Sequence, residues 1–413
     1  MNRVVITGLG AITPIGNDVK TYWENLKAGK HGIAPITKFD ASQTGIALAA
    51  EVKDFDPTLT MDRKEYKRMD LFSQYAVASA VEALNDAGLA DLATQTNVER
   101  VGVMMSSGIG GLNDMQSGIV KMHDKGPKRV PPLFVPLTIG NMAAGNVSMK
   151  VGAKGISLDI VTACASSTNA IGEAFRHIKH GYSDVIIAGG SEGTICEIGI
   201  AGFAALTALS TSTNPDRASM PFDQERNGFV MGEGGATLIL ESLEHAQKRG
   251  AKIYAEVVGY GSNSDAYHMT APTPDGSGAG KAIQLALDEA GITPQQVDYI
   301  NAHGTSTPTN DSSETTAIKY AFKEHATKVA ISSTKSMTGH LLGGAGAIEA
   351  IACVKALQEG VLPPTANYQV KDELCDLDYI PNVARQCQAT YAISNSLGFG
   401  GHNAVLCFKK FIQ

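Results

Sequence analysis

The sequence has 413 residues, of which 43% are hydrophobic and 18% are charged, the balance of a well-packed globular protein. Its net charge of −7 argues against general binding to nucleic acid. No stretch reaches the roughly 18 uninterrupted apolar residues that span a bilayer, and the N-terminus lacks a signal-peptide layout, so we expect a cytoplasmic protein.

Strand and helix patterns alternate along the chain, which is typical of an α/β protein whose sheets are covered by helices. In chain order we expect a strand at 3–8, a helix at 74–87, strands at 101–105 and 156–162, a helix at 169–178, strands at 184–188, 252–261, 297–302 and 329–334, a helix at 345–357, and a last strand from 391 to the glycines near 401.

The two halves of the chain echo each other. In the first half an apolar strand breaks at Cys164 and becomes an Ala-rich helix, and in the second half a strand leads into a Gly-rich turn at His340 and then a helix. The echo predicts a duplicated α/β unit with halves at 1–250 and 251–413 that pack as one body, because no low-complexity linker separates them. Identity between the halves is low, so a generic α/β protein with chance echoes is the alternative.

One of the six cysteines differs from the others in its setting. Cys164 lies where the strand turns abruptly into a helix among small residues, and we expect its side chain to be exposed at the end of the sheet. The N-terminus of a helix favours a thiolate, which is the nucleophile, and offers N–H groups to an oxyanion. The alternative is a cysteine packed in the core.

Two histidines in the second half occupy loops rich in Gly, Ser and Thr. His303 follows a predicted strand, and His340 lies at an elbow that we interpret as equivalent to that of Cys164. If the halves fold alike, Cys164 and His340 face one another and His303 lies beside them. Isolated histidines are more often ordinary surface or core residues.

Three blocks, at 162–166, 301–308 and 335–340, resemble the signature blocks of the β-ketoacyl-acyl-carrier-protein synthases in content, order and spacing. The resemblance runs over essentially the whole chain, and within the family it is greatest to the synthase II branch. It implies a thiolase-like fold, with duplicated halves in five layers (α/β/α/β/α), a homodimer, and no cofactor or metal.

The resemblance also implies a mechanism. Cys164 would accept the growing chain from acyl-carrier protein, and His303 and His340 would stabilise the enolate formed when the malonyl group loses carbon dioxide. Lys335 would orient the histidines, with Glu349 as its counter-charge. From the residues alone this last pair would be an ordinary surface ion pair.

The substrate channel is likewise implied by the resemblance. The backbone N–H groups of Cys164 and Phe399 would form the oxyanion hole, and Phe399 would gate the acyl pocket. Thr305 and Thr307 would bind the pantetheine arm. Further channel residues are expected to be Asp265, His268 and Thr270 on a second gating loop, Ile109 and Phe203 in the acyl pocket, and Phe134 reaching it across the dimer.

An acidic carrier protein needs a basic surface on this acidic chain. We expect docking at Lys64, Lys67, Arg68, Lys128 and Arg129, which belong to the two densest basic runs. Charge runs also mark ordinary solvated faces.

The sequence departs from the family pattern at His402, where Thr is common, and at Gly344, where Ala is usual. Open alternatives are a synthase I-type enzyme or polyketide ketosynthase of the same fold and, from a different class, a cysteine–histidine hydrolase. A thiolase would need a second catalytic cysteine near 398–403, and a chain-length factor would lack the nucleophile. A dinucleotide site at Gly8 lacks its third glycine, because residue 13 is Thr.

Overall fold

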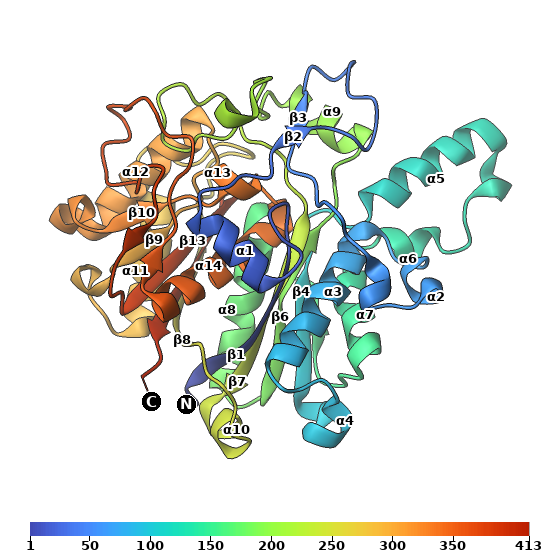
Figure 1. The fold of residues 1–413 in the computed structure, drawn as a ribbon, viewed down its shortest axis with the longest axis horizontal. Helices are drawn as coiled ribbons and strands as arrows, with labels where there is room; N and C mark the ends of the chain where they lie inside the picture. Colours follow the sequence, from blue (N-terminus) through green and yellow to red (C-terminus); the bar gives the residue numbers. More distant parts are fainter. Residues whose placement is uncertain (413) are drawn as a thin grey trace.

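A computed structural model describes residues 1–412, and its main feature is a mixed sheet built from both halves of the chain (Figure 1). From one edge to the other its ten strands are β10 (Ala330–Ser332), β9 (Tyr299–Asn301), β13 (Tyr391–Gly398), β14 (His402–Lys410), β8 (Ala255–Ser264), β1 (Val4–Ile12), β7 (Gly234–Ser242), β6 (Val185–Glu192), β4 (Val101–Ser106) and β5 (Ser157–Leu158).

The order of strands confirms the predicted duplication. Counted outward from the centre, the first half runs β1, β7, β6, β4, β5 and the second runs β8, β14, β13, β9, β10, with the same parallel and antiparallel pairings. The halves join where Val4–Ile6 pairs antiparallel with Ala255–Val257. The chain therefore builds the same five-stranded unit twice.

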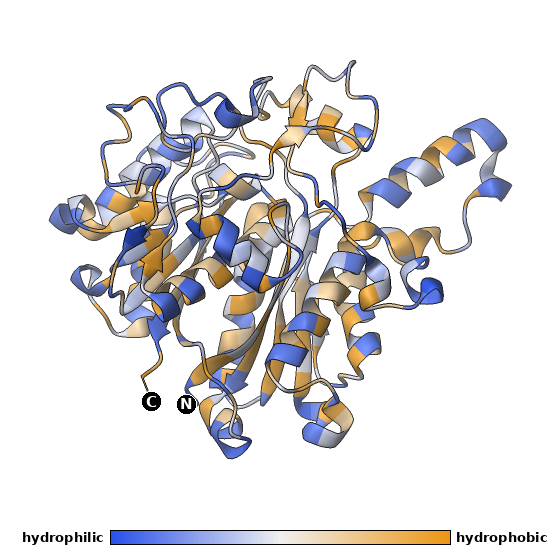
Figure 2. Cartoon of the chain, in the orientation of Figure 1, coloured by the Kyte–Doolittle hydropathy of each residue, from blue (hydrophilic) through white to orange (hydrophobic). Residues whose placement is uncertain are grey.

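The helices complete five layers, which Figure 1 shows from side to side. Helices α8 (Ser166–Lys179) and α14 (Ala345–Glu359) lie between the two halves of the sheet and contact both. Outside the first half lie α3 (Leu71–Asp86) and α7 (Met142–Val151), and outside the second half lie α11 (Ser277–Ala290) and α12 (Pro308–Phe322). The strands and central helices are largely hydrophobic, whereas the tip of the projecting helix α5 (Leu112–Lys125) is hydrophilic (Figure 2).

Close contact between sheet and helix depends on glycine at matching places. A Cβ on Gly10 of β1 would overlap the carbonyl oxygen of Ser79 in α3, and a Cβ on Gly261 of β8 would overlap that of Ala282 in α11. Both positions therefore exclude a side chain, which is a second mark of the duplication.

The strand expected at 156–162 is much shorter than predicted, because side chains replace the sheet ladder after Leu158. The Asp159 carboxylate accepts from the N–H of Ser107, and the N–H of Ile160 donates to the hydroxyl of Ser106. The chain is thereby directed away from the sheet and towards the Cys164 elbow. The other expected strands and helices are present, with ends shifted by a few residues.

The remaining elements are short. They comprise the strand pairs β2 (Ala34–Pro35) with β3 (Leu48–Ala49) and β11 (Val361–Leu362) with β12 (Arg385–Gln386), the helices α1 (Val19–Lys27), α2 (Arg63–Tyr66), α4 (Leu92–Gln95), α6 (Phe134–Thr138), α9 (Glu197–Ala205), α10 (Leu243–Lys248) and α13 (Lys335–Thr338), and the 3-10 turns η1 (Pro57–Leu59), η2 (Val98–Arg100), η3 (Pro127–Arg129), η5 (Pro215–Arg217), η6 (Pro294–Gln296) and η7 (Lys323–Thr327). Within residues 1–412, the helices are all too short or too polar to cross a membrane.

Candidate active site

Cys164 lies in a tight elbow at the start of α8. The 3-10 turn η4 (Ala163–Ala165) leads into the helix, and Ala163 has a φ of +52°, a conformation that residues other than glycine rarely adopt. The Ser166 hydroxyl braces this elbow, because it accepts from the N–H of Thr162 (2.9 Å) and donates to the carbonyl of Ala163 (2.6 Å). The strained backbone is thus held by its own helix.

The equivalent elbow in the second half is η8 (Leu342–Gly344), before α14. Leu342 begins it with a φ of +48°, so the residue that matches Cys164 is Gly343. The prediction that His340 occupies the matching place is wrong, because residues 333–341 between β10 and the elbow include an added helix, α13. His340 reaches the site from this longer segment.

The thiol of Cys164 is buried, which corrects the prediction of an exposed side chain. Burial raises its pKa to about 12, although Lys335 and the backbone N–H groups of Cys164 and Phe399 lower it. Glu192 raises it further. Burial therefore opposes the thiolate that the helix N-terminus favours. The two N–H groups do lie beside the sulfur, where an oxyanion hole would need them.

The sulfur opens into a cavity of about 300 Å³ that connects it with the surface. Residues from both halves line this cavity, including the predicted site residues Cys164, Phe203, Asp265, Thr270, His303, Thr305, Thr307, His340 and Phe399. The juxtaposition that the sequence predicted for Cys164, His303 and His340 is therefore present.

The hydrogen bonds of the two histidines fix where their ring protons lie. Nδ1 of His340 accepts from the N–H of Leu342 (3.2 Å), and Nδ1 of His303 is 3.4 Å from the ammonium of Lys335, which donates to it. Each neutral ring must therefore carry its proton on Nε2. The ring centroids are 5.3 Å apart, and the Nε2 of His340 has no partner among the described residues.

Both imidazoles are neutral. Burial and the charge of Lys335 hold the pKa of His303 and of His340 well below the ordinary value, and His340 lowers that of His303 further. The site thus offers two uncharged N–H donors that need no change of protonation before use.

Lys335 and Glu349 form a fully buried ion pair, not the surface pair that their residue types alone would indicate. The neighbouring carboxylate of Glu314, on α12, accepts from the N–H groups of His303 (2.8 Å) and Gly304 (2.7 Å). The Glu314 carboxylate and the Lys335 ammonium therefore hold the His303 loop from two sides.

The two predicted gating loops touch. The N–H of Gly400 donates to the carbonyl of Met269 (2.7 Å), and the N–H of Asp265 donates to that of Gly401 (2.8 Å). The Asp265 carboxylate also accepts from the side chain of Asn403 (2.7 Å). Neither loop can therefore move away from the other without breaking these hydrogen bonds.

Other expected channel residues divide into two groups. Phe203 lies against Phe399, with ring centroids 6.4 Å apart. His268 does not line the cavity, and its Nδ1 caps the turn by accepting from the N–H groups of Thr270 and Ala271. Neither Ile109, which is 38% exposed after β4, nor Phe134, which packs on Gly118 of α5, lines the cavity of the single chain.

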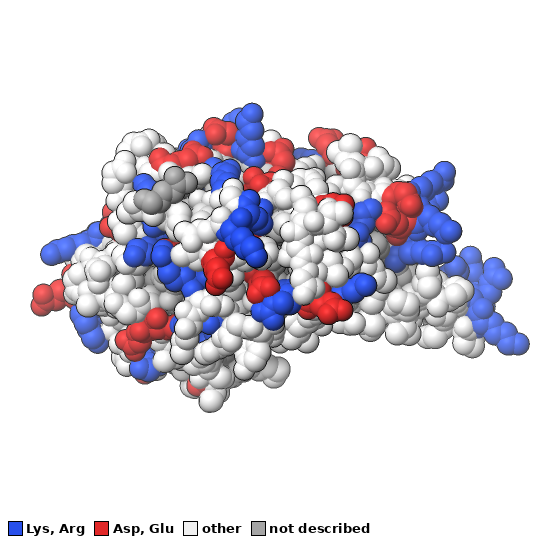
Figure 3. Space-filling view, turned by 90° about the horizontal axis from the view of Figure 1, so that it is seen from below, with Lys and Arg blue, Asp and Glu red and all other residues white. Residues whose placement is uncertain are grey.

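The five expected docking residues are all exposed. Within residues 1–412 none of them forms an ion pair, so their charges are free to meet a partner. Helix α5 and the turn η3 that follows it form a projecting segment, which we call the α5–η3 arm (residues 112–129). Figure 3 shows Lys and Arg gathered at the end of the molecule where this arm projects.

Sequence reasoning missed several buried charges around the site. Glu192 ends β6, and Asp311 and Glu314 lie in the first turns of α12, directly after the 301–308 block. Arg226 reaches the same block from a distant loop. The two acidic residues of α12 could have been found from their place beside the block, but nothing local marks Arg226.

Comparison with known proteins gives one consistent family. The family model described as "Beta-ketoacyl synthase, N-terminal domain" matches residues 1–246, and "Beta-ketoacyl synthase, C-terminal domain" matches residues 254–369. A 3-oxoacyl-[acyl-carrier-protein] synthase 2 from Synechocystis sp. is 53% identical over 99% of this chain and 98% of its own length. One from Staphylococcus aureus (strain COL) has the same identity and coverage.

Solved structures agree. A beta-ketoacyl synthase from Burkholderia phymatum is 37% identical with a TM-score of 0.92, and each chain is covered completely. A ketosynthase structure solved with its type II polyketide-synthase acyl-carrier protein is 36% identical with a TM-score of 0.92, covering 99% of this chain and 100% of the other.

Proposed function

This chain belongs to the beta-ketoacyl synthase family and is a condensing enzyme of the 3-oxoacyl-[acyl-carrier-protein] synthase type, and we propose that Cys164, His303 and His340 perform its chemistry. The observation that carries this assignment is one cavity shared by a thiol beside two backbone N–H groups and by two neutral imidazoles with Nε2 protons. Acyl transfer and enolate formation each need one of these sets of donors.

In the first half-reaction, the sulfur of Cys164 attacks the thioester carbonyl of an acyl-carrier protein. The N–H groups of Cys164 and Phe399 stabilise the tetrahedral oxyanion. When this intermediate collapses, the carrier thiol leaves with the proton that the cysteine thiol loses. Burial, which raises the pKa of the Cys164 thiol, favours loss of its proton during the attack.

In the second half-reaction, the malonyl thioester oxygen accepts from Nε2 of His303 and of His340. The bond to the carboxylate breaks, carbon dioxide leaves, and the electron pair becomes an enolate held by the two N–H donors. The enolate carbon then attacks the acyl-cysteine carbonyl, and the cysteine sulfur departs and takes up a proton from solvent. Lys335 orients His303 through Nδ1.

We propose that acyl-carrier protein docks on basic residues in and just after α2 and in η3, in keeping with the related ketosynthase solved with its carrier. These residues are Lys64, Lys67, Arg68, Lys128 and Arg129. We also propose a homodimer, in which a second copy covers the exposed apolar side chains Leu133, Val135, Ile139, Leu158 and Val161 near the β5 edge and places Phe134 at the acyl pocket. The boundary between the halves 1–250 and 251–413 and a cytoplasmic location stay predictions.

The assignment is tested by incubation with acyl-carrier proteins of graded chain length, with acylation read by mass spectrometry. Cys164 is expected to gain the acyl group, and malonyl-carrier protein is then expected to remove it as a 3-oxoacyl product. Cys196, a buried cysteine whose pKa burial raises, serves as the internal control that stays unmodified. Release of free acid without a malonyl donor would instead indicate a hydrolase.

A further inference from the structure

The turn that carries Thr305 and Thr307 has a strained backbone. Their hydroxyl oxygens are 2.9 Å apart, and both residues line the cavity. Ser306 between them has a φ of +70°, in the left-handed region that disfavours a side chain. Such a conformation persists only where the surroundings over-determine it.

Three contacts surround the buried Ser306. Its N–H lies 3.2 Å from the Asp311 carboxylate and donates to it. Its hydroxyl accepts from the N–H of Met220 (2.9 Å), and its carbonyl accepts from the N–H of Gly228 (3.0 Å). These contacts fix the middle of the turn but not its exit towards α12.

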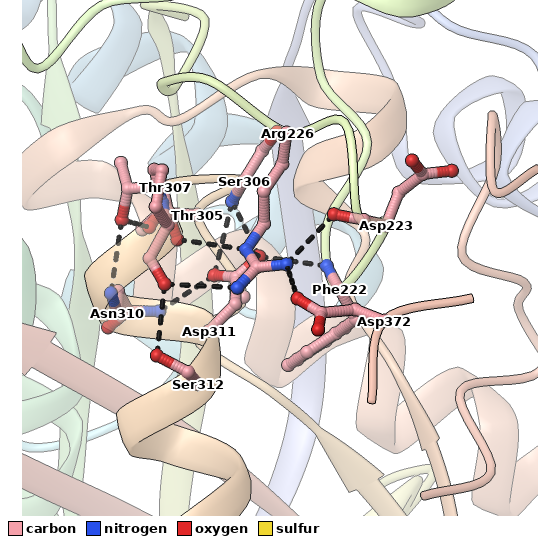
Figure 4. Close-up of polar contacts among 12 residues, drawn as sticks. Phe222, Asp223, Arg226, Thr305, Ser306, Thr307, Asn310, Asp311, Ser312 and Asp372 are labelled. Carbon is pink, nitrogen blue, oxygen red and sulfur yellow. Dashed lines mark hydrogen bonds and ion pairs between the residues drawn. The ribbon is translucent and has the colours of Figure 1, made fainter. Parts of the chain in front are cut away.

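Arg226 holds that exit (Figure 4). Its Nε donates to the carbonyl of Thr307 (3.3 Å), and its Nη2 donates to that of Pro308 (3.0 Å). Its Nη1 donates back to the carbonyl of Asp223 (2.8 Å), on its own loop. The planar guanidinium therefore ties the loop before β7 to both carbonyls at the exit.

Besides donating hydrogen bonds to the exit of the turn, Arg226 supplies a positive charge beside the carboxylate that holds Ser306. Only 7% of Arg226 is exposed, and it pairs with Asp372 and lies 3.6 Å from the fully buried Asp311. Burial raises the pKa of Asp311, while Arg226 lowers it. Loss of the cation would leave the carboxylate that holds Ser306 buried without its counter-charge.

We propose that Arg226 is a positioning residue that presents the hydroxyls of Thr305 and Thr307 to the pantetheine arm of the carrier-bound substrate. It does not line the cavity and acts through the turn. The inference rests on the proposed function, because it needs a substrate that carries this arm. It goes further by assigning part of the recognition of the arm to a residue outside the channel.

The test uses Arg226→Lys, which keeps the charge but loses the planar fork of donors. Acylation of Cys164 is followed by mass spectrometry with two donors, hexanoyl-pantetheine and S-ethyl hexanethioate, which has no arm. The second-order rate with hexanoyl-pantetheine is expected to fall about tenfold, the effect of roughly two weakened hydrogen bonds. The rate with the ethyl thioester is expected to change less than about twofold, because it makes no contact with the threonines.

Arg217→Lys is the matched control. Arg217 lies on the same loop and binds Asp223 and Glu225, but it does not contact the threonine turn, so both rates are expected to stay unchanged. An equal fall with both donors in Arg226→Lys, or no fall with either, overturns the positioning role. Failure of wild-type Cys164 to take the acyl group from either donor counts against the proposed function instead.

If Arg226→Lys does not fold, Asp372→Asn tests the same idea at the edge of the network. It weakens one partner of the guanidinium and leaves the bonds to Thr307 and Pro308 in place. A smaller loss, again confined to hexanoyl-pantetheine, is expected, and a loss that is the same for both donors overturns the proposal.

Discussion

Each half of the molecule turns from a strand region into a buried central helix at an elbow, and only one of the two elbows carries a reactive side chain. Ala163 and Leu342 begin the two turns with nearly the same positive φ, and Cys164 and Gly343 follow them. The Cys164 side chain faces the cavity, whereas a Cβ on Gly343 would overlap the backbone nitrogen of Gly108. The two elbows have equivalent backbones, but only the first has room for a side chain.

The N–H groups at the two elbows also differ in their partners. The N–H of Gly343 donates to the Glu192 carboxylate at 3.0 Å, and the same carboxylate accepts from Ser107, Gly108 and Ile109. The N–H of Cys164 lies beside its own sulfur at the end of the cavity. One elbow thus already holds a carboxyl group of the protein, while the other can receive the oxyanion of a substrate. The duplication gives both elbows the same backbone geometry. The partner of the N–H group at each elbow decides whether that N–H can stabilise the oxyanion of a substrate.

The largest effect on activity is expected from Cys164→Ala, at the first of the two elbows. Alanine fits the elbow, so the protein should fold, but condensation should fall by more than about a thousandfold because the nucleophile is gone. Decarboxylation of malonyl-carrier protein should continue, because His303 and His340 remain. Release of carbon dioxide and formation of the 3-oxoacyl product are measured separately in the same reaction.

Adding His340→Ala to that variant tests whether decarboxylation depends on the histidines and not on the cysteine. The second change removes one of the two Nε2 donors, and decarboxylation should fall about a hundredfold or more. A Cys164→Ala variant that has already lost decarboxylation would contradict the separate roles of the cysteine and the two histidines.

The sequence predicted which residues form the site better than it predicted their burial and their pKa values. The blocks around Cys164, His303 and His340 identify the cavity, because motif order and spacing survive in the linear chain. The raised pKa of the Cys164 thiol was not predictable, because it depends on burial by residues remote in sequence. The match of Cys164 with Gly343 was also missed, because α13 is inserted only in the second half and offsets the alignment of the two elbows.

A smaller effect, confined to stability, is expected from Gly343→Ala. The added methyl group overlaps Gly108, so the free energy of unfolding should fall by roughly 1–3 kcal/mol, which thermal denaturation measures. The control is Gly202→Ala in α9, where the new methyl group meets open space and should be neutral or slightly stabilising. Equal stability of the two variants would contradict the close packing at the second elbow.

An effect that appears only as a change with pH concerns the charge of Glu192. Burial raises its pKa to about 7, although its hydrogen bonds lower it. Between its ordinary pKa of about 4.5 and 7, the folded protein binds this proton more tightly than the unfolded chain does. Its contribution to stability is therefore complete below about pH 4.5 and is lost as the pH rises to 7, by roughly 3 kcal/mol in total.

Glu192→Gln cannot titrate, so its deficit relative to the wild type should be largest near pH 5 and should shrink as the pH approaches 8. Thermal midpoints measured across this range give the difference. Glu241→Gln is the control of opposite sign, because Arg249 and His245 hold the pKa of Glu241 below its ordinary value, and that deficit should grow as the pH rises. If the Glu192 deficit stays constant with pH, the carboxylate at the second elbow keeps one charge throughout. The two elbows would then differ in the space beside them and in the partner of the N–H group, but not in how they respond to protons.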